Sequence, residues 1–189
     1  MDRRIEPYLA FAGEVDRATA RLRERHPGAV RCRAGCDLCC RDFFPITALE
    51  ADGVRQGLEL LPDFLRESVR RRARAAVDEL ARRGIDPARL DDAARALAGT
   101  PHALCPMNEG GLCTVYDHRP IVCRTFGYPA DGLAHPCPGG NFADPNADYG
   151  SLAGTRIEAR LARLALAHVA GTARDGRGSS NLILALEEG

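Results

Sequence analysis

The sequence contains no lysine, so all 26 of its Lys and Arg positions are arginine. A Schiff-base amine, the lysine of a phosphate-binding P-loop and a lysine general base all need an ε-amine, and an arginine guanidinium cannot replace it. These mechanisms are therefore excluded. An excess of one charge is also missing, because 26 acidic residues balance the arginines and give a formal net charge of zero. A nucleic-acid partner, which favours a strongly basic chain, is not indicated.

Long apolar runs are lacking as well. The first residues, 1–6, begin a charged amphipathic stretch without the apolar centre of a signal peptide, and no run is long enough to span a bilayer. We therefore expect a cytoplasmic protein without membrane association, whose thiols stay reduced. A chain of 189 residues can bury a core as one domain without disulfides. The alternative, a disulfide framework, requires export by a route that the sequence does not show.

Apolar periodicity predicts a mainly α fold in which helices flank a loop-rich, metal-organised cysteine module. Residues 1–26 carry an apolar stripe at three- and four-residue intervals, with Pro7 in the first turn. Thr47 and Glu50 form a capping-box pattern that opens a second helix. A third helix is expected over 62–84, with Phe64 among its inward residues and Gly84 at its end, and a fourth from Asp86–Pro87 to about Gly99.

Residues 100–150 differ from the rest, because proline and glycine recur there and helical periodicity disappears. Residues 151–171 return to a helix, and 175–180 are expected to be a linker before an apolar run, 181–186, too short to assign. We expect a single domain over 1–189. It consists of a cysteine module (32–40 plus 100–150), a helical insertion (45–99) and the C-terminal helix (151–171).

Eight cysteines fall into two groups, and their spacing favours a metal site. Short spacings let a chain wrap one ion, because thiolate sulfurs must converge on it within a tetrahedron. In a reduced compartment, four thiols within nine residues are a strong indication of metal binding. The candidate metal ligands are Cys32, Cys36, Cys39 and Cys40 in the first group, and Cys105, Cys113, Cys123 and Cys137 in the second.

The spacing leaves the number of ions open. Eight thiolates can make two four-thiolate sites, one larger cluster, or one closed site with spare thiols for exchange. The adjacent pair Cys39–Cys40 requires a tight turn to share one ion; otherwise it bridges two ions or one member faces away. Four thiolates on a divalent ion carry a charge near −2, which arginines beside the cysteines can offset: Arg33, Arg41, Arg119 and Arg124.

Aromatic residues are few, yet six of the ten lie within five residues of a cysteine. They are expected either to exclude water from the site or to form the core beneath the loops. These residues are Phe43, Phe44, Tyr116, Phe126, Tyr128 and Phe142.

The order of these motifs resembles the YkgJ-like cysteine-cluster family, described as a zinc- or iron-chelating domain. The resemblance rests on Cys32-x3-Cys36-x2-Cys39-Cys40, Pro45-Ile46-Thr47 with Glu50, Cys105-Pro106, Gly111-Leu112-Cys113, Arg119-Pro120 and Cys123-Arg124, and it covers about residues 32–137. Met107-Asn108 departs from the family's more apolar pattern. The resemblance implies Cys36, Cys39, Cys40, Cys105, Cys113 and Cys123 as ligands, with Cys32 and Cys137 as further members. One branch resembles a flagellin lysine methylase.

Other candidates are weaker. His102, His118 and His135 lie among the cysteines and can bind metal, but surface or capping roles are favoured with eight thiols present. An arginine run over 66–83 is interleaved with acidic residues, which favours a solvated helix face over a nucleic-acid site. The pairs Gly110–Gly111 and Gly139–Gly140 are read as plain turns.

Three functions remain. The first is a protein that binds zinc or iron, the latter also as an iron-sulfur cluster, for storage, delivery or sensing. The second is an iron-sulfur oxidoreductase, or an accessory protein of a modifying enzyme such as a protein methylase. The third is a zinc-stabilised module that binds a protein partner.

Overall fold

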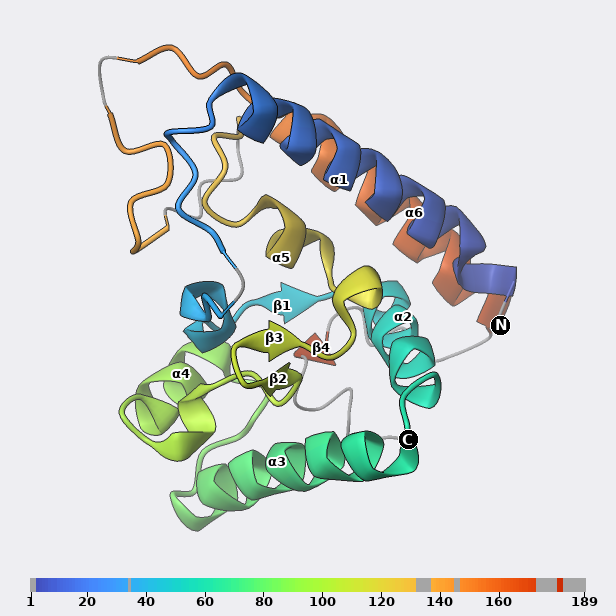
Figure 1. Ribbon diagram of the computed structural model, residues 1–189. Helices are drawn as coiled ribbons and strands as arrows, with labels where there is room; N and C mark the ends of the chain where they lie inside the picture. Colours follow the sequence, from blue (N-terminus) through green and yellow to red (C-terminus); the bar gives the residue numbers. More distant parts are fainter. Residues whose placement is uncertain (1–2, 34, 132–136, 145–146, 173–179, 182–189) are drawn as a thin grey trace.

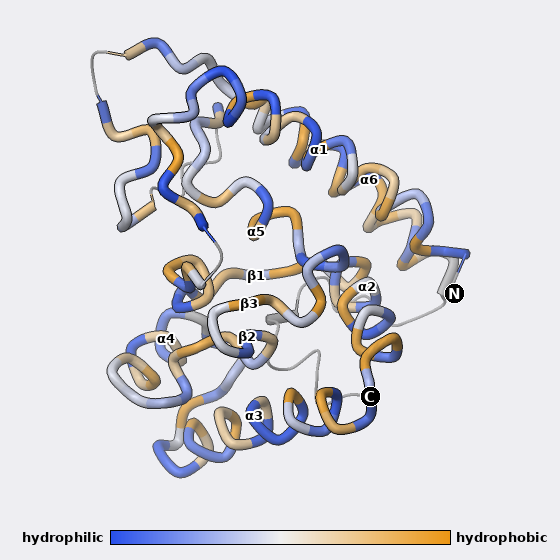
Figure 2. Tube along the Cα trace, in the orientation of Figure 1, coloured by the Kyte–Doolittle hydropathy of each residue, from blue (hydrophilic) through white to orange (hydrophobic). Residues whose placement is uncertain are grey.

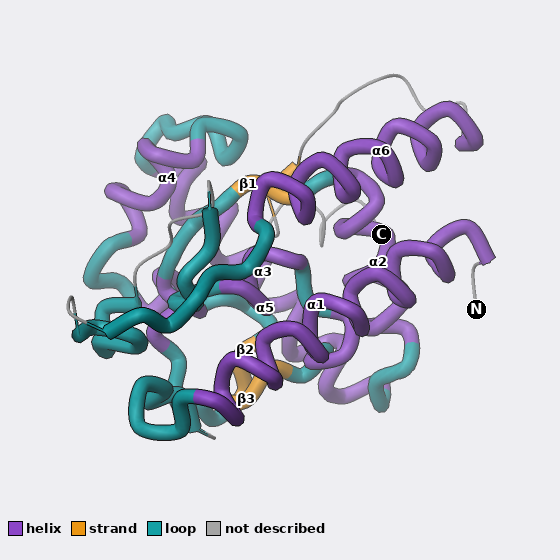
Figure 3. The backbone as a smooth tube through the Cα atoms, turned by 90° about the horizontal axis from the view of Figure 1, so that it is seen from above, coloured by secondary structure: helices purple, strands orange, loops and turns teal. Residues whose placement is uncertain are grey.

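Two long helices, α1 (Glu6–Arg25) and α6 (Gly154–Thr172), lie side by side along one side of the molecule and run in opposite directions (Figure 1). The computed structural model describes residues 3–33, 35–131, 137–144, 147–172 and 180–181. Six α-helices and four two-residue strands occur within these ranges, which confirms the mainly α prediction. A third long helix, α3 (Asp63–Arg82), crosses the opposite side of the molecule (Figure 1). Seen from above, helices make up most of the regular structure and the strands are short (Figure 3).

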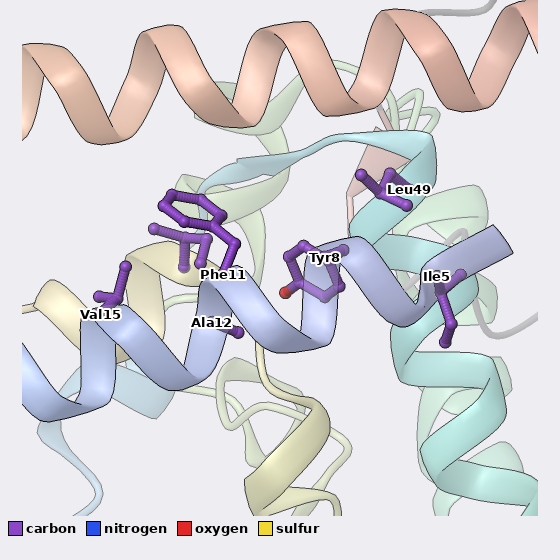
Figure 4. Packing of buried hydrophobic residues seen from close by; sticks show 7 residues of the cluster. Ile5, Tyr8, Phe11, Ala12, Val15 and Leu49 are labelled. Atoms are coloured by element: carbon purple, nitrogen blue, oxygen red, sulfur yellow. The ribbon is translucent and has the colours of Figure 1, made fainter. Parts of the chain in front are cut away.

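Helix α1 forms where the apolar stripe predicted it, with Pro7 in its first turn. Its buried side chains alternate with hydrophilic ones along the helix (Figure 2). They pack with Leu49 of α2 (Ala48–Glu59), with Ile121 of α5 (Ile121–Thr125) and with the half-buried face of α6. Figure 4 shows Tyr8 and Phe11 within this cluster. Each large side chain buried there contributes about 1.5–3 kcal/mol.

The capping box at the start of α2 is present as predicted. The Thr47 hydroxyl accepts the Glu50 N–H at 3.2 Å, and Glu50 Oε2 accepts the Thr47 N–H at 2.8 Å. The other carboxylate oxygen of Glu50 accepts the N–H of Ile121, the first residue of α5, at 2.9 Å. One buried carboxylate therefore joins the first turns of α2 and α5.

Helix α3 packs against α4 (Leu90–Leu97) and ends at Gly84, whose φ of +67° confirms the predicted terminal glycine. Two details of the prediction are wrong. Phe64 is 72% exposed, because five residues of helix turn it about 140° away from buried Val69. Asp86 does not cap α4: its carboxylate accepts the Ala88 N–H at 2.9 Å in a turn, and the helix begins later.

Helix α6 begins three residues after the predicted start, beside Asp131. The Asp131 carboxylate accepts the Gly154 N–H at 2.6 Å and the Thr155 hydroxyl at 3.0 Å. These hydrogen bonds lower the pKa of Asp131. Helix α6 faces α1 with the predicted apolar residues Ile157, Leu161, Leu164 and Ala165.

The strands form two small antiparallel pairs. Strand β1 (Pro45–Ile46) pairs with β4 (Ser180–Asn181), and β2 (Asn108–Glu109) pairs with β3 (Leu112–Cys113). Asn181 was left unassigned by the sequence, whereas Ser180 was expected to end a linker and instead lies in a strand. Gly110 and Gly111 join β2 to β3 with φ of +59° and +84°, so their prediction as a turn is confirmed. Single 3-10 turns complete the structure: η1 (Arg3–Ile5), η2 (Leu38–Arg41), η3 (Pro101–Ala103) and η4 (Tyr116–His118).

The second half of the chain contains a short helix that the sequence did not indicate. Helix α5, inside 100–150, was not predicted because its five residues are too few to show a period. The expected linker over 175–180 lies outside the described residues except for Ser180. In the described ranges, no helix combines the length and the apolar character needed to cross a membrane.

Candidate metal centre

All eight cysteines line one cavity of about 770 Å³. The first group approaches it from the loop after α1 and from η2, whereas the second group comes from the β2–β3 hairpin, from α5 and from the segment at Cys137. The hairpin and α5 lie between the α1–α6 pair and α3 (Figure 1). The fold thus brings two cysteine groups that are distant in sequence to the same space.

A contact between two glycines holds the groups together. A Cβ on Gly111 would lie 2.6 Å from the Cα and 2.9 Å from the carbonyl oxygen of Gly35, closer than side-chain carbons approach backbone. Both residues also have positive φ, +84° and +86°, a region that favours glycine. The first cysteine loop therefore rests directly on the tip of the hairpin.

The adjacent pair Cys39–Cys40 lies in the 3-10 turn η2, the tight turn that sharing one ion requires. Both residues line the cavity. The two side chains are hydrogen-bonded to each other. The Cys105 N–H donates to the Cys40 carbonyl at 2.7 Å, which fixes this turn against the second group.

Three cysteines of the second group share a local arrangement in which the sulfur accepts a backbone N–H two residues later. Met107 donates to Cys105, Val115 to Cys113, and Gly139 to Cys137 at 3.3 Å. Such N–H···S bonds stabilise negative charge on sulfur. The backbone of the second group is therefore arranged for thiolates.

Two asparagines that sequence reasoning missed also face sulfur atoms. The Asn141 Nδ2 donates to Cys32 Sγ at 2.9 Å, while its Oδ1 accepts the Arg31 N–H at 2.7 Å. Asn108 is 5% exposed and lines the cavity; its Oδ1 accepts the Gly111 N–H at 2.9 Å, and it lies close enough to Cys40 to lower that thiol's pKa. Its Nδ2 thus lies near Cys40 but has no partner at hydrogen-bond geometry.

Three thiols of the second group, Cys105, Cys113 and Cys123, favour the neutral form when no cation is near. Burial raises the pKa of Cys105 to about 12, raises that of Cys113, and raises that of Cys123 well above its ordinary value. Negative charge on neighbouring cysteines adds to each shift. A reactive nucleophile needs a lowered pKa, so these three are poorly suited to covalent catalysis, whereas a bound cation reverses the cost of deprotonation.

The vicinal pair behaves differently. The Cys39 thiol donates to Cys40, which lowers the pKa of Cys40 to about 6 and raises that of Cys39. Within the pair, Cys40 is therefore the thiol that ionises more readily, and Cys39 keeps its proton.

The predicted arginine partners separate into distinct roles. Arg124 is 3% exposed and pairs with Asp16 while donating to the carbonyls of Asp117 and Arg119, at 2.6 and 3.0 Å. Arg119 pairs with the same Asp16 at 3.0 Å. Their positive charges partly offset the burial that raises the pKa of Cys113. Asp16, on α1, gave no sequence signal because its partners lie about a hundred residues away.

The other two predicted arginines lie toward solvent. Arg41 forms an ion pair with Asp37 at 2.5 Å, and its charge lowers the pKa of Cys40. Arg33 is exposed at the cavity rim.

Five of the six predicted aromatic residues line the cavity. Phe126 is buried, whereas Tyr116 is 58% exposed. The Arg119 guanidinium carbon lies 3.6 Å from the centre of the Tyr116 ring, a cation–π contact. The sixth, Phe142, packs instead against Tyr128 and Tyr149. The aromatic residues therefore serve partly as cavity wall and partly as packing around it.

Histidine does not line the cavity among the described residues. His118 directs its Nδ1 toward the Gly53 carbonyl at 3.1 Å, and the predicted His135 lies outside the described residues. In the arginine run of α3, Arg66 and Arg70 pair with Glu59, as a solvated face requires. Arg72 is an exception, because it donates to the Pro106 carbonyl at 2.9 and 2.7 Å and so anchors the Cys105 loop.

The donor set suits a thiophilic ion such as zinc or iron, because sulfur is the ligand that all eight residues offer. Among the described residues, no three cysteine, histidine or carboxylate side chains are grouped closely enough to hold an ion as they stand. The residues that could hold one therefore share a cavity whose side chains must converge further.

Comparisons of the chain with protein-family models, with curated proteins and with solved structures find no match. The resemblance to the YkgJ-like family stays a prediction, and the functional argument rests on the cavity itself.

Proposed function

We propose that this protein binds zinc or iron through clustered cysteine thiolates and uses the site for metal storage, delivery or sensing. The observation that carries the proposal is the convergence of all eight cysteines on one cavity. Bringing thiols from two groups that are distant in sequence to one cavity is the arrangement that a shared metal site requires.

The surroundings of the sulfur atoms support this function. Backbone N–H groups donate to three of them, and Arg119 and Arg124 supply positive charge near Cys113. A four-thiolate site on a divalent ion carries a charge near −2, which such donors and cations offset. When bound, the ion would supply the positive charge that the buried thiols need in order to ionise.

Anaerobic purification followed by elemental analysis and an absorption spectrum tests the proposal. Stoichiometric zinc in a colourless protein, or iron with a visible absorption band, supports metal binding. Acid-labile sulfide together with brown colour would indicate an iron-sulfur cluster and exclude a site for zinc alone. Absence of every transition metal, with no uptake of zinc or iron by the reduced protein, would overturn the proposal.

A further inference from the structure

The eight cysteines lie at different depths in the cavity. Cys105 and Cys113 pack against a buried cluster that includes Met107 and Val115. Cys123 lies on α5 between the buried residues Ile121 and Arg124. Cys32, in contrast, is exposed. The thiols therefore do not have equal access to solvent.

Four thiols form what we term the deep set: Cys40, Cys105, Cys113 and Cys123. The Cys105 N–H donates to the Cys40 carbonyl at 2.7 Å, and Cys113 follows on the same hairpin. Cys123 interacts electrostatically with the other three. These residues come from three separate parts of the fold and are mutual neighbours.

The remaining thiols form the outer set: Cys32, Cys36, Cys39 and Cys137. Asn141 lies beside two of them. Its Nδ2 donates to Cys32 Sγ at 2.9 Å. Cys137 is near the same amide, because a Cβ placed on Gly127 would lie 2.6 Å from Cys137 Cβ and 3.2 Å from Asn141 Nδ2. Cys36 directly follows the exposed Gly35 turn. Cys32 is the exposed member of this set, Cys36 and Cys137 lie on loops, and Cys39 lies in η2 beside Cys40.

Each set has one asparagine, and the two asparagines are used in the same way. Asn108 and Asn141 each accept a backbone N–H with Oδ1, from Gly111 and Arg31 respectively. The Nδ2 of Asn141 already bonds a sulfur, whereas the Nδ2 of Asn108 is buried without a partner. A buried donor without a partner in a cavity lined by thiols can hydrogen-bond a sulfur once that sulfur is a thiolate, because a thiolate is a stronger acceptor than a thiol.

We propose that the deep set holds one ion that the protein retains, and that the outer set holds a second ion that exchanges with solvent and with acceptor molecules. This division rests on the proposed metal-binding function. Closed four-thiolate sites are structural, whereas transfer of an ion requires that an incoming ligand reach the sulfur atoms. Arg119 and Arg124, fixed by Asp16, lie on the side of the deep set.

A matched pair of variants, Asn108→Asp and Asn141→Asp, tests the division. Each keeps the oxygen that accepts a backbone N–H and replaces the sulfur-facing donor with an acceptor. The full chain is reduced anaerobically, loaded with Co²⁺ alone, and followed by its thiolate-to-cobalt absorption band during challenge with a chelator. The unaltered protein is expected to release one ion rapidly and a second slowly.

The two variants should differ in which ion they lose. Asn108→Asp is expected to lower the affinity for the slowly released ion by roughly 10- to 100-fold, a typical effect of removing a hydrogen bond to a metal ligand. The affinity for the rapidly released ion should not change. Asn141→Asp should have the opposite pattern. If Asn108→Asp does not fold, Cys32→Ser at the exposed position should still abolish the fast ion alone.

The outcomes separate the division from the function on which it rests. Release of all ions in a single step, or equal effects of the two asparagine variants on both ions, would overturn the division while leaving metal binding intact. Failure of the unaltered protein to take up Co²⁺, zinc or iron would overturn the proposed function itself.

Discussion

The contact between Gly35 and Gly111 can be tested with two adjacent glycines of one turn. Gly111→Ala introduces a carbon 2.6 Å from the Gly35 Cα, whereas Gly110→Ala introduces one with nothing within 4 Å. Both glycines have positive φ, so each alanine costs about 1–2 kcal/mol through its backbone conformation. Only Gly111→Ala adds overlap with backbone, which costs about 1–3 kcal/mol.

Urea or thermal unfolding of both variants measures the difference. For a chain of this size, 1 kcal/mol corresponds to about 2–4 °C in Tm, so Gly111→Ala should melt about 2–12 °C below Gly110→Ala. Metal affinity should follow, because the overlap pushes the first cysteine loop away from the hairpin. If metal binding requires the loop to return to the hairpin, each 1.4 kcal/mol that this return costs lowers the metal affinity about tenfold.

Two results would refute this reasoning. Equal stabilities of the two variants would mean that the loop does not rest on the hairpin. A destabilised Gly111→Ala with unaltered metal affinity would mean that the contact is structural and that the two cysteine groups do not need it to bind an ion together.

Three further predictions follow from the structure. Cys36→Ser and Cys123→Ser should each lower metal content and loosen residues 100–150, and unchanged elemental analysis and Tm in both would contradict a joint site. Glu50→Ala should destabilise the protein by about 2–4 kcal/mol in urea, since it removes a helix cap and leaves a buried N–H of α5 without an acceptor, whereas exposed Glu59→Ala should cost less than about 1 kcal/mol. The lowered pKa of Asp131 means that its carboxylate stabilises the folded protein above the ordinary pKa of 3.8, and that this stabilisation is lost as the pH falls through the folded-state pKa. The free energy of unfolding should therefore change less between pH 7 and pH 3 in Asp131→Asn than in the unaltered protein. Identical pH profiles of that variant and the unaltered protein would show that the carboxylate at the start of α6 does not contribute.

Local sequence signals predicted most of the helical framework. The stripe of α1, the capping box at Thr47 and the terminal Gly84 each depend on residues three or four positions apart, and each is present. The errors have local causes too. Phe64 was assigned to the buried face by its type rather than its angle, and Asp86 forms a turn that resembles a cap.

The site was less predictable, because its supporting contacts are long-range. The spacing of the cysteines identified the candidate ligands, and their common cavity agrees with that grouping. Nothing near Asn141 in sequence indicates Cys32, and nothing near Asp16 indicates Arg124, since each pair is separated by more than a hundred residues. The buried Nδ2 of Asn108 depends on tertiary packing that its sequence neighbours do not indicate.

The carboxylate of Glu50 has a consequence for how the cavity would close. Its hydrogen bond from the Ile121 N–H fixes α5, which carries Cys123, against α2. Arg72 fixes the loop at Cys105 by donating to the Pro106 carbonyl. The side of the cavity formed by the second cysteine group is therefore held by these contacts. The opposite side, the segment from Cys32 to Cys40, contains only a 3-10 turn in its described residues. We expect the second cysteine group to keep its position when no ion is bound, so closing the cavity around an ion would require the first group to move.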